Sequence, residues 1–169
     1  MMQLNNPSGT PVEVSELERL LVDAGVRKII SAYAKIGRAF SWATTRHDIL
    51  ISETALLVKN TYDNKHLVID KLIAAGNSAD FFIHLPASAT FSGTAITGVC
   101  LDSDWSSDDN ADAYQHEINN TVGSVIIRAS SPCVLELDGA IRIGSGKCIA
   151  VDFEDEANNS SVTLFGHFE

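Results

Sequence analysis

Short apolar runs separated by turn-forming residues follow one another from residue 38 to the end of the chain. In 147–154, for example, Ile149, Val151 and Phe153 alternate with Ala150 and Asp152. A period of two places one set of side chains on a buried face of a β-strand and the other on a solvated face. The pattern predicts antiparallel strands at 38–44, 48–51, 55–59, 66–74, 80–86, 95–101, 113–118, 123–129, 132–137, 140–143, 147–154 and 161–168.

The polar interruptions between the runs predict how the strands are connected. Residues 60–65 divide 55–76 into two apolar runs, so we expect a hairpin that supplies two inner strands. Asp138 and Gly139 are typical of a tight hairpin turn, and the Asn and Ser residues of 156–161 favour a longer hairpin connection. An isolated hairpin is only marginally stable in water. We therefore predict a mainly β fold, an antiparallel jelly-roll-like β-sandwich.

The N-terminal region has a different composition. Residues 1–14 are rich in polar side chains and contain Pro7, Gly9 and Pro11, which predicts an extended arm. The rest of the chain, 15–169, is short enough to form one domain around one core. Within it, 15–36 is expected to be a helical or mixed lead-in to the sandwich.

A short amphipathic helix is predicted at the start of this lead-in. Ser15 and Glu18 form a capping box, and Gly25 is a plausible end of the helix. Between them, apolar residues recur at i, i+3, i+4 and i+7, namely Leu17, Leu20, Leu21 and Ala24. Residues 26–36 suit a helix or a strand equally well, so the pattern leaves both open.

The charge of the chain narrows the classes of partner. The 169 residues have a formal net charge of −10, with acidic groups gathered at 102–112 and 152–156. Such a surface repels nucleic-acid phosphates, so we expect no direct nucleic-acid binding. No apolar run approaches the roughly 20 residues that span a bilayer. The first residues lack the basic and apolar segments of a secretory signal, so we expect cytoplasmic synthesis and no membrane contact.

The acidic loop is the only candidate cation site that the spacing indicates. Asp102, Asp104 and Asp108 start like a calcium loop, because hard cations bind several carboxylate oxygens together. The loop then lacks the central Gly and the final Glu of a calcium loop, which favours a solvated acidic loop instead. Trp105 lies in the same loop, where it suits a contact with a partner or a lid over the core.

No motif indicates an enzyme or a cofactor. The stretch 144–148 resembles the end of a phosphate-binding loop, but Ile141 and Cys148 replace residues that such a loop needs. The five histidines are dispersed without the spacing of a metal site, and His84 and His167 are expected on strand faces opposite the apolar ones. The three cysteines, Cys100, Cys133 and Cys148, are predicted to be buried apolar residues in a reduced compartment.

A family resemblance adds to this interpretation. The hairpin-like stretch 55–76, the runs 81–86 and 92–102, and the closing 144–169 together resemble small structural proteins of tailed-phage virions. These include capsid decoration or cement proteins and related head and tail accessories. The resemblance covers roughly 38–169 and consists of a hydrophobic rhythm with a few Asn and Gly positions.

The resemblance implies a non-enzymatic virion protein without cofactors, made in the host cytoplasm and located on the capsid exterior. It further implies a homo-oligomer, commonly a trimer, that binds the major capsid protein lattice and stabilises the head. The residues expected to contact partners are Pro7, Pro11, Val12, Leu17, Leu21 and Trp105. The alternative is a tail- or fibre-associated module that recognises a host-surface glycan, with Trp42 or Trp105 stacking on sugar. A third class, a cupin-like enzyme, needs clustered His and Glu residues that the sequence does not show.

Overall fold

The computed structural model describes residues 33–34, 38–45, 47–50, 53–76, 80–87, 91–104, 110–118 and 123–169. The predicted arm at 1–14 and the predicted helix at 15–25 lie outside these residues, as does most of 26–36. Of the described residues, 69% are in strands, which confirms the prediction of a mainly β fold. The strands are β1 (Ala39–Ala43), β2 (His47–Ile49), β3 (Glu53–Asn60), β4 (Leu67–Ala75), β5 (Asp80–Ala87), β6 (Thr94–Ile96), β7 (Val99–Cys100), β8 (Ala111–Ile118), β9 (Val125–Ser130), β10 (Cys133–Ile143), β11 (Cys148–Phe153) and β12 (Ala157–Phe168).

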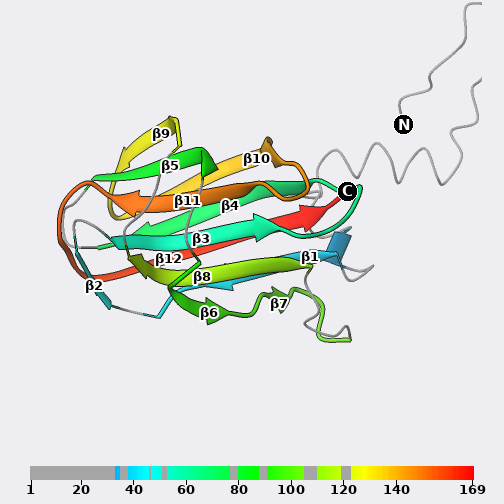
Figure 1. The fold of residues 1–169 in the computed structure, drawn as a ribbon, viewed down its shortest axis with the longest axis horizontal. Helices are drawn as coiled ribbons and strands as arrows, with labels where there is room; N and C mark the ends of the chain where they lie inside the picture. Colours follow the sequence, from blue (N-terminus) through cyan, green and yellow to red (C-terminus); the bar gives the residue numbers. More distant parts are fainter. Residues whose placement is uncertain are drawn as a thin grey trace, which may run out of the picture.

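The strands form two antiparallel sheets (Figure 1). Sheet 1 has the order β10-β4-β12-β1-β7, with β2 pairing a further part of β12. Sheet 2 has the order β6-β8-β3-β11-β5-β9. Strands β9 and β10 lie at one lateral edge of the molecule, and β6 and β7 lie at the opposite edge.

The inward-facing side chains of both sheets form one core. Phe40, Trp42 and Phe168 contribute aromatic rings from sheet 1, with centroids 5.9–6.5 Å apart. Phe81 and Phe153 contribute an edge-to-face pair from sheet 2. These rings and the aliphatic residues between them are buried in one cluster, so the two sheets pack face to face as a sandwich.

Three expected hairpin connections are wrong. Strands β3 and β4 lie in different sheets, so 55–76 is a corner that crosses the core and not a hairpin. Strands β11 and β12 also lie in different sheets, so the residues before and within 156–161 make a second corner. Asp138 and Gly139 lie inside β10, where positive φ angles of 46° and 78° and a register shift mark a bulge.

The hairpins were predicted wrongly because turn residues show where the chain changes direction but not which strand pairs with the next one. A six-residue connection can join neighbours in one sheet or strands in opposite sheets, and both leave the same alternation on each strand. The bulge likewise joins the predicted strands 132–137 and 140–143 into the single strand β10.

Sheet 2 also has a small apolar cluster on its outer face. Leu57, Cys148 and Ala150 are buried there, with Phe91 and Tyr114 packed against them. Ala150 is therefore covered, although the alternation predicts a solvated position for it. Cys148 and Cys100 are buried and all three cysteines are free thiols, in line with their predicted role as small apolar residues.

Within the described part of the chain, no helix is both long and apolar enough to cross a membrane.

Candidate functional site

The predicted cation loop is described only in part. Asp102 and Asp104 follow β7, and the backbone N–H of Asp104 donates to Asp102 Oδ1 at 3.1 Å, so one carboxylate serves the local turn. Asp108 and Trp105 lie outside the described residues, as do the predicted partner contacts Pro7, Pro11, Val12, Leu17 and Leu21. Among the residues that are described, no three His, Cys, Asp or Glu side chains are grouped to hold a metal ion.

Trp42 is fully buried in the core. Its ring packs near Phe40 and against the edge of Phe168, both of which are also buried. The idea that Trp42 stacks on a sugar is therefore wrong, because its position in β1 points inward. A period-two pattern that places Phe40 in the core places Trp42 there as well.

His167 lies on the predicted strand face but is not exposed there. It lies on the outer face of sheet 1, as predicted, but it is only 2% exposed. Its Nδ1 is 2.7 Å from Asp70 Oδ2, and its ring stacks on Tyr33 with centroids 4.1 Å apart. The imidazole is thus covered by the Tyr33 ring, which the sequence could not reveal because Tyr33 and His167 are far apart in the chain.

The outer face of sheet 2 carries a second pairing of histidine with acid. His84 Nε2 is 3.1 Å from Asp152 Oδ2, and the His84 ring packs edge-on against Phe82. His84 is half-buried, which agrees with its predicted position opposite the apolar face. A third pair joins His116 Nδ1 to Glu53 Oε1 at 3.3 Å.

Arg128 organises the charged side chains at the β9 edge of the same face. It binds Asp80 Oδ2 through Nε at 3.1 Å, contacts the Glu154 carboxylate, and lies over the Phe82 ring. A hydrogen bond from Ser130 and the Arg128 guanidinium lower the pKa of Asp80, and the Asp80 hydrogen bond together with Glu154 raises the pKa of Arg128. One guanidinium thus binds two carboxylates and leaves a net negative charge, which suits a hydrated surface network.

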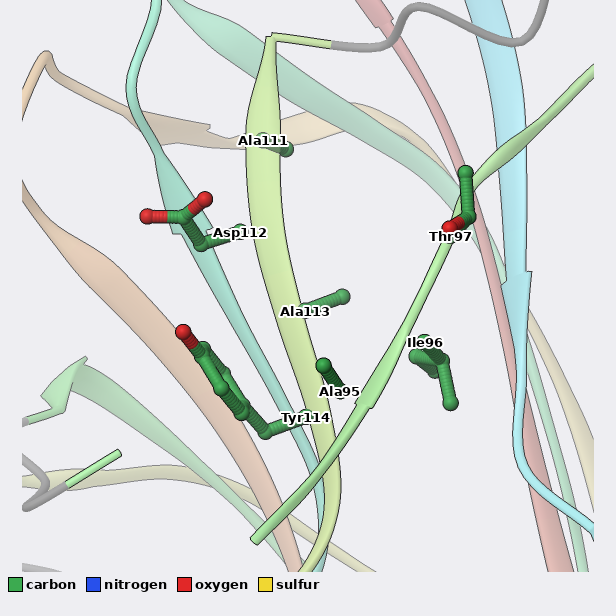
Figure 2. Close-up of a pocket in the computed structure, with 7 residues that line it drawn as sticks. All are labelled: Ala95, Ile96, Thr97, Ala111, Asp112, Ala113 and Tyr114. Carbon is green, nitrogen blue, oxygen red and sulfur yellow. The ribbon is translucent and has the colours of Figure 1, made fainter. Parts of the chain in front are cut away.

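A shallow pocket lies where β6 separates from β8 (Figure 2). Strand β6 pairs with β8 as far as Ile96 and Ala113, and the chain then crosses to sheet 1. The pocket has a volume of about 170 Å³ and is lined mainly by small residues, Ala95, Ala111 and Ala113 among them. Figure 2 shows the Asp112 and Tyr114 side chains on the side of β8 away from Ile96 and Thr97, so the pocket does not bring these polar side chains together with Thr97.

Asn60 is a buried polar residue with several side-chain hydrogen bonds, and the sequence did not reveal its role. It ends β3 and is fully buried. Its side-chain amide donates to the carbonyls of Lys65 and Ile143 at 2.8 and 2.9 Å, and its Oδ1 accepts from the Tyr62 N–H at 2.9 Å. Asn60 thus joins the β3–β4 corner to the end of β10. An Asn at the boundary between an apolar run and a polar interruption was the available signal.

Comparisons with protein-family models, with curated protein sequences and with solved structures gave no significant match for this chain. The function is therefore argued from the fold and from the chemistry of its surfaces.

Proposed function

We propose that the sandwich is a jelly roll. Eight of its strands, in chain order β1, β3, β4, β5, β9, β10, β11 and β12, support this topology through their pairing. The first pairs with the last, the second with the seventh, the third with the sixth and the fourth with the fifth. This is the order that results when one long hairpin is wound around a barrel axis, and it gives two sheets of four strands.

On this topology three of the four remaining strands are additions at one lateral edge. Strands β6, β7 and β8 come between β5 and β9 in the chain, and they extend the sheet edges at β3 and β1. The short strand β2 pairs with the first part of β12. The additions leave the eight-strand order intact, so they favour an elaborated jelly roll over an unrelated sandwich.

The function that we propose is that of a non-enzymatic structural virion protein. It forms a homo-oligomer, a trimer by the resemblance, and binds the outer surface of a phage capsid as a decoration or cement protein that stabilises the head. The wound strand order is the observation that carries this proposal, because jelly rolls are a common architecture of viral capsid domains. Many weak contacts repeated over a lattice supply the binding by avidity.

The described surface is compatible with such a role. The His84, His116 and His167 side chains each face a carboxylate in the fold. The Arg128 network and the chain's net charge of −10 keep the exterior hydrated. The proposed capsid contacts are the arm at 1–14 with Pro7, Pro11 and Val12, together with Leu17, Leu21 and Trp105.

The alternative function is a glycan-binding module of a tail or fibre, because lectin domains also use jelly rolls. With Trp42 buried in the core, stacking on sugar depends on Trp105. This alternative is tested by applying the purified chain to an array of bacterial surface glycans. Specific binding that the Trp105→Ala variant loses would favour it over the capsid proposal.

The capsid proposal is tested by sedimentation. Purified protein is mixed with expanded empty capsids of the phage that encodes the chain, and the bound fraction is measured in the pellet. We expect the full chain to co-sediment and a variant lacking 1–14 to bind more weakly while keeping the same thermal unfolding midpoint. Equal binding by both variants would contradict the role of the arm, and absence of binding by the full chain would contradict the capsid proposal.

A further inference from the structure

The two outer faces of the sandwich have different chemistry. The outer face of sheet 2 carries ion pairs and single charges along several strands, including Asp80, His84, Arg128 and Asp152. On sheet 1, the positions that alternate with the core residues of β1, β4, β10 and β12 are mainly uncharged. Ser41, Ala43, Ile73, Val134, Thr163 and Phe165 are six of them.

These six residues lie side by side in two rows. One row runs through Val134, Ile73, Thr163 and Ala43, which are register partners across four strands of sheet 1. The next row contains Phe165 and Ser41 on β12 and β1. Val134 is 54% exposed although it is a large apolar side chain, and Ile73 and Phe165 are only half-buried. Charged side chains also lie on this face. Lys71 and Glu136 continue the second row and pair with each other at 3.0 Å, and Arg142, further along β10, pairs with Glu169 at 2.7 Å.

The chain enters the sandwich over this same face. Tyr33 stacks on His167, which is an outer-face residue of sheet 1, and its carbonyl accepts a hydrogen bond from the Arg38 N–H at 2.9 Å. Beside them the outer-face residues Ala39 and Val68 are buried, whereas Val134, further from Tyr33, is exposed. Tyr33 therefore lies at one end of this face, next to its uncovered part, and 32 residues of the chain precede it.

We infer that the chain's own residues 15–32 cover the outer face of sheet 1. The inference goes beyond the proposed function, because it concerns the free protein and holds whether or not a capsid is the partner. The apolar stripe of the predicted helix, with Leu17 and Leu21, matches an uncharged face. The acidic side chains Glu16 and Asp23 remain on the side that faces solvent.

The dimensions allow this arrangement. A helix over 16–24 is about 13 Å long at 1.5 Å per residue. The centres of the outermost of five neighbouring strands are about 19 Å apart at ~4.8 Å per strand. Residues 25–32 reach up to ~26 Å when extended, so Leu17 and Leu21 can lie anywhere on the face while Tyr33 stays on His167.

Photo-cross-linking of the full chain tests the inference. Benzoylphenylalanine is placed at Val134 or at Ala43, which are exposed positions on the sheet 1 face, and at the exposed Asp112 of sheet 2 as a control. A mixture of isotopically light and heavy chains is irradiated without capsids, and cross-linked peptides are identified by mass spectrometry. We expect cross-links from at least one sheet 1 position to residues 15–32 of the same chain, and none to 15–32 from Asp112.

A pair of substitutions tests whether the apolar stripe makes the contact. The double variant Leu17→Asp and Leu21→Asp should lose the cross-link, whereas the matched polar-face variant Asp23→Asn should keep it. Three results would overturn the inference. They are cross-links between light and heavy chains, which identify a second copy as the occupant; no cross-link to 15–32; and a cross-link that L17D/L21D leaves unchanged.

Discussion

Replacing Asn60 by alanine removes the three hydrogen bonds by which its side chain joins the β3–β4 corner to the end of β10. The Ile143 carbonyl is buried, so losing its partner leaves an unsatisfied acceptor that costs about 1–3 kcal/mol. The Lys65 carbonyl and the Tyr62 N–H are only partly buried, so water replaces Asn60 there at roughly 0.5–1 kcal/mol each. The expected total is roughly 2–5 kcal/mol of unfolding free energy.

For a chain of this size each kcal/mol shifts the thermal midpoint by about 2–4 °C. We therefore expect Asn60→Ala to lower the midpoint by roughly 4–20 °C, measured by circular dichroism or differential scanning calorimetry. The exposed Asn158 on β12 is a matched control, because Asn158→Ala should change the unfolding free energy by less than about 0.5 kcal/mol. If both variants unfold at the same temperature, the Asn60 side chain does not hold the β3–β4 corner to the end of β10.

The isosteric variant Asn60→Asp separates shape from hydrogen bonding. It keeps the acceptor for the Tyr62 N–H but places a carboxylate against the carbonyls of Lys65 and Ile143. We expect it to be at least as destabilised as Asn60→Ala at neutral pH, because an unpaired buried charge is costly. Acidification should reduce the difference from the native chain, since a protonated carboxyl donates to one of the carbonyls. A difference that does not depend on pH would refute this reasoning.

Two further predictions concern packing and thiol chemistry. A Cβ on Gly166 would lie 2.6 Å from the Val68 carbonyl oxygen, so Gly166→Ala should lower the unfolding free energy by about 1–3 kcal/mol in chemical denaturation. Gly144→Ala is the control and should cost far less, because a Cβ there has nothing within 4 Å. Equal denaturation midpoints for the two variants would contradict the packing of β12 on β4. Burial raises the pKa of the Cys148 thiol, so maleimide should modify the half-buried Cys133 first under native conditions, as detected by mass spectrometry. Faster labelling of Cys148 would show that the residues that cover it on sheet 2 move away.

The positions of the strands could be predicted from the sequence because a strand with one buried face has apolar residues at every second position. The runs at 147–154 and 161–168 correspond to β11 and β12, and Ile149, Val151 and Phe153 all lie in the core. The pairing partners could not be predicted, since the same alternation fits a hairpin and a corner between sheets. Strands β3 and β4 show this, because their connection crosses the core.

The candidate surface residues were harder to predict, because burial on an outer face depends on segments distant in sequence. The alternation predicts His167 on the face opposite the apolar one, where it lies, but it does not reveal that Tyr33 covers the ring and that Asp70 binds it. Trp42 was offered as a sugar contact although its own alternation with Phe40 placed it inward. Asn60 stands out in the sequence only as the start of the polar interruption 60–65, since its partners Lys65 and Ile143 are far apart in the chain and meet only in the folded structure.

The central claim is that this chain is a structural unit that coats a capsid in many copies. The most direct measurement is the number of chains bound per particle at saturation, by cryo-electron microscopy of expanded capsids mixed with excess purified protein. The account predicts density for a two-sheet domain on the outer surface, in a fixed ratio to the capsid subunits. Bare capsid surfaces at saturating protein would contradict it.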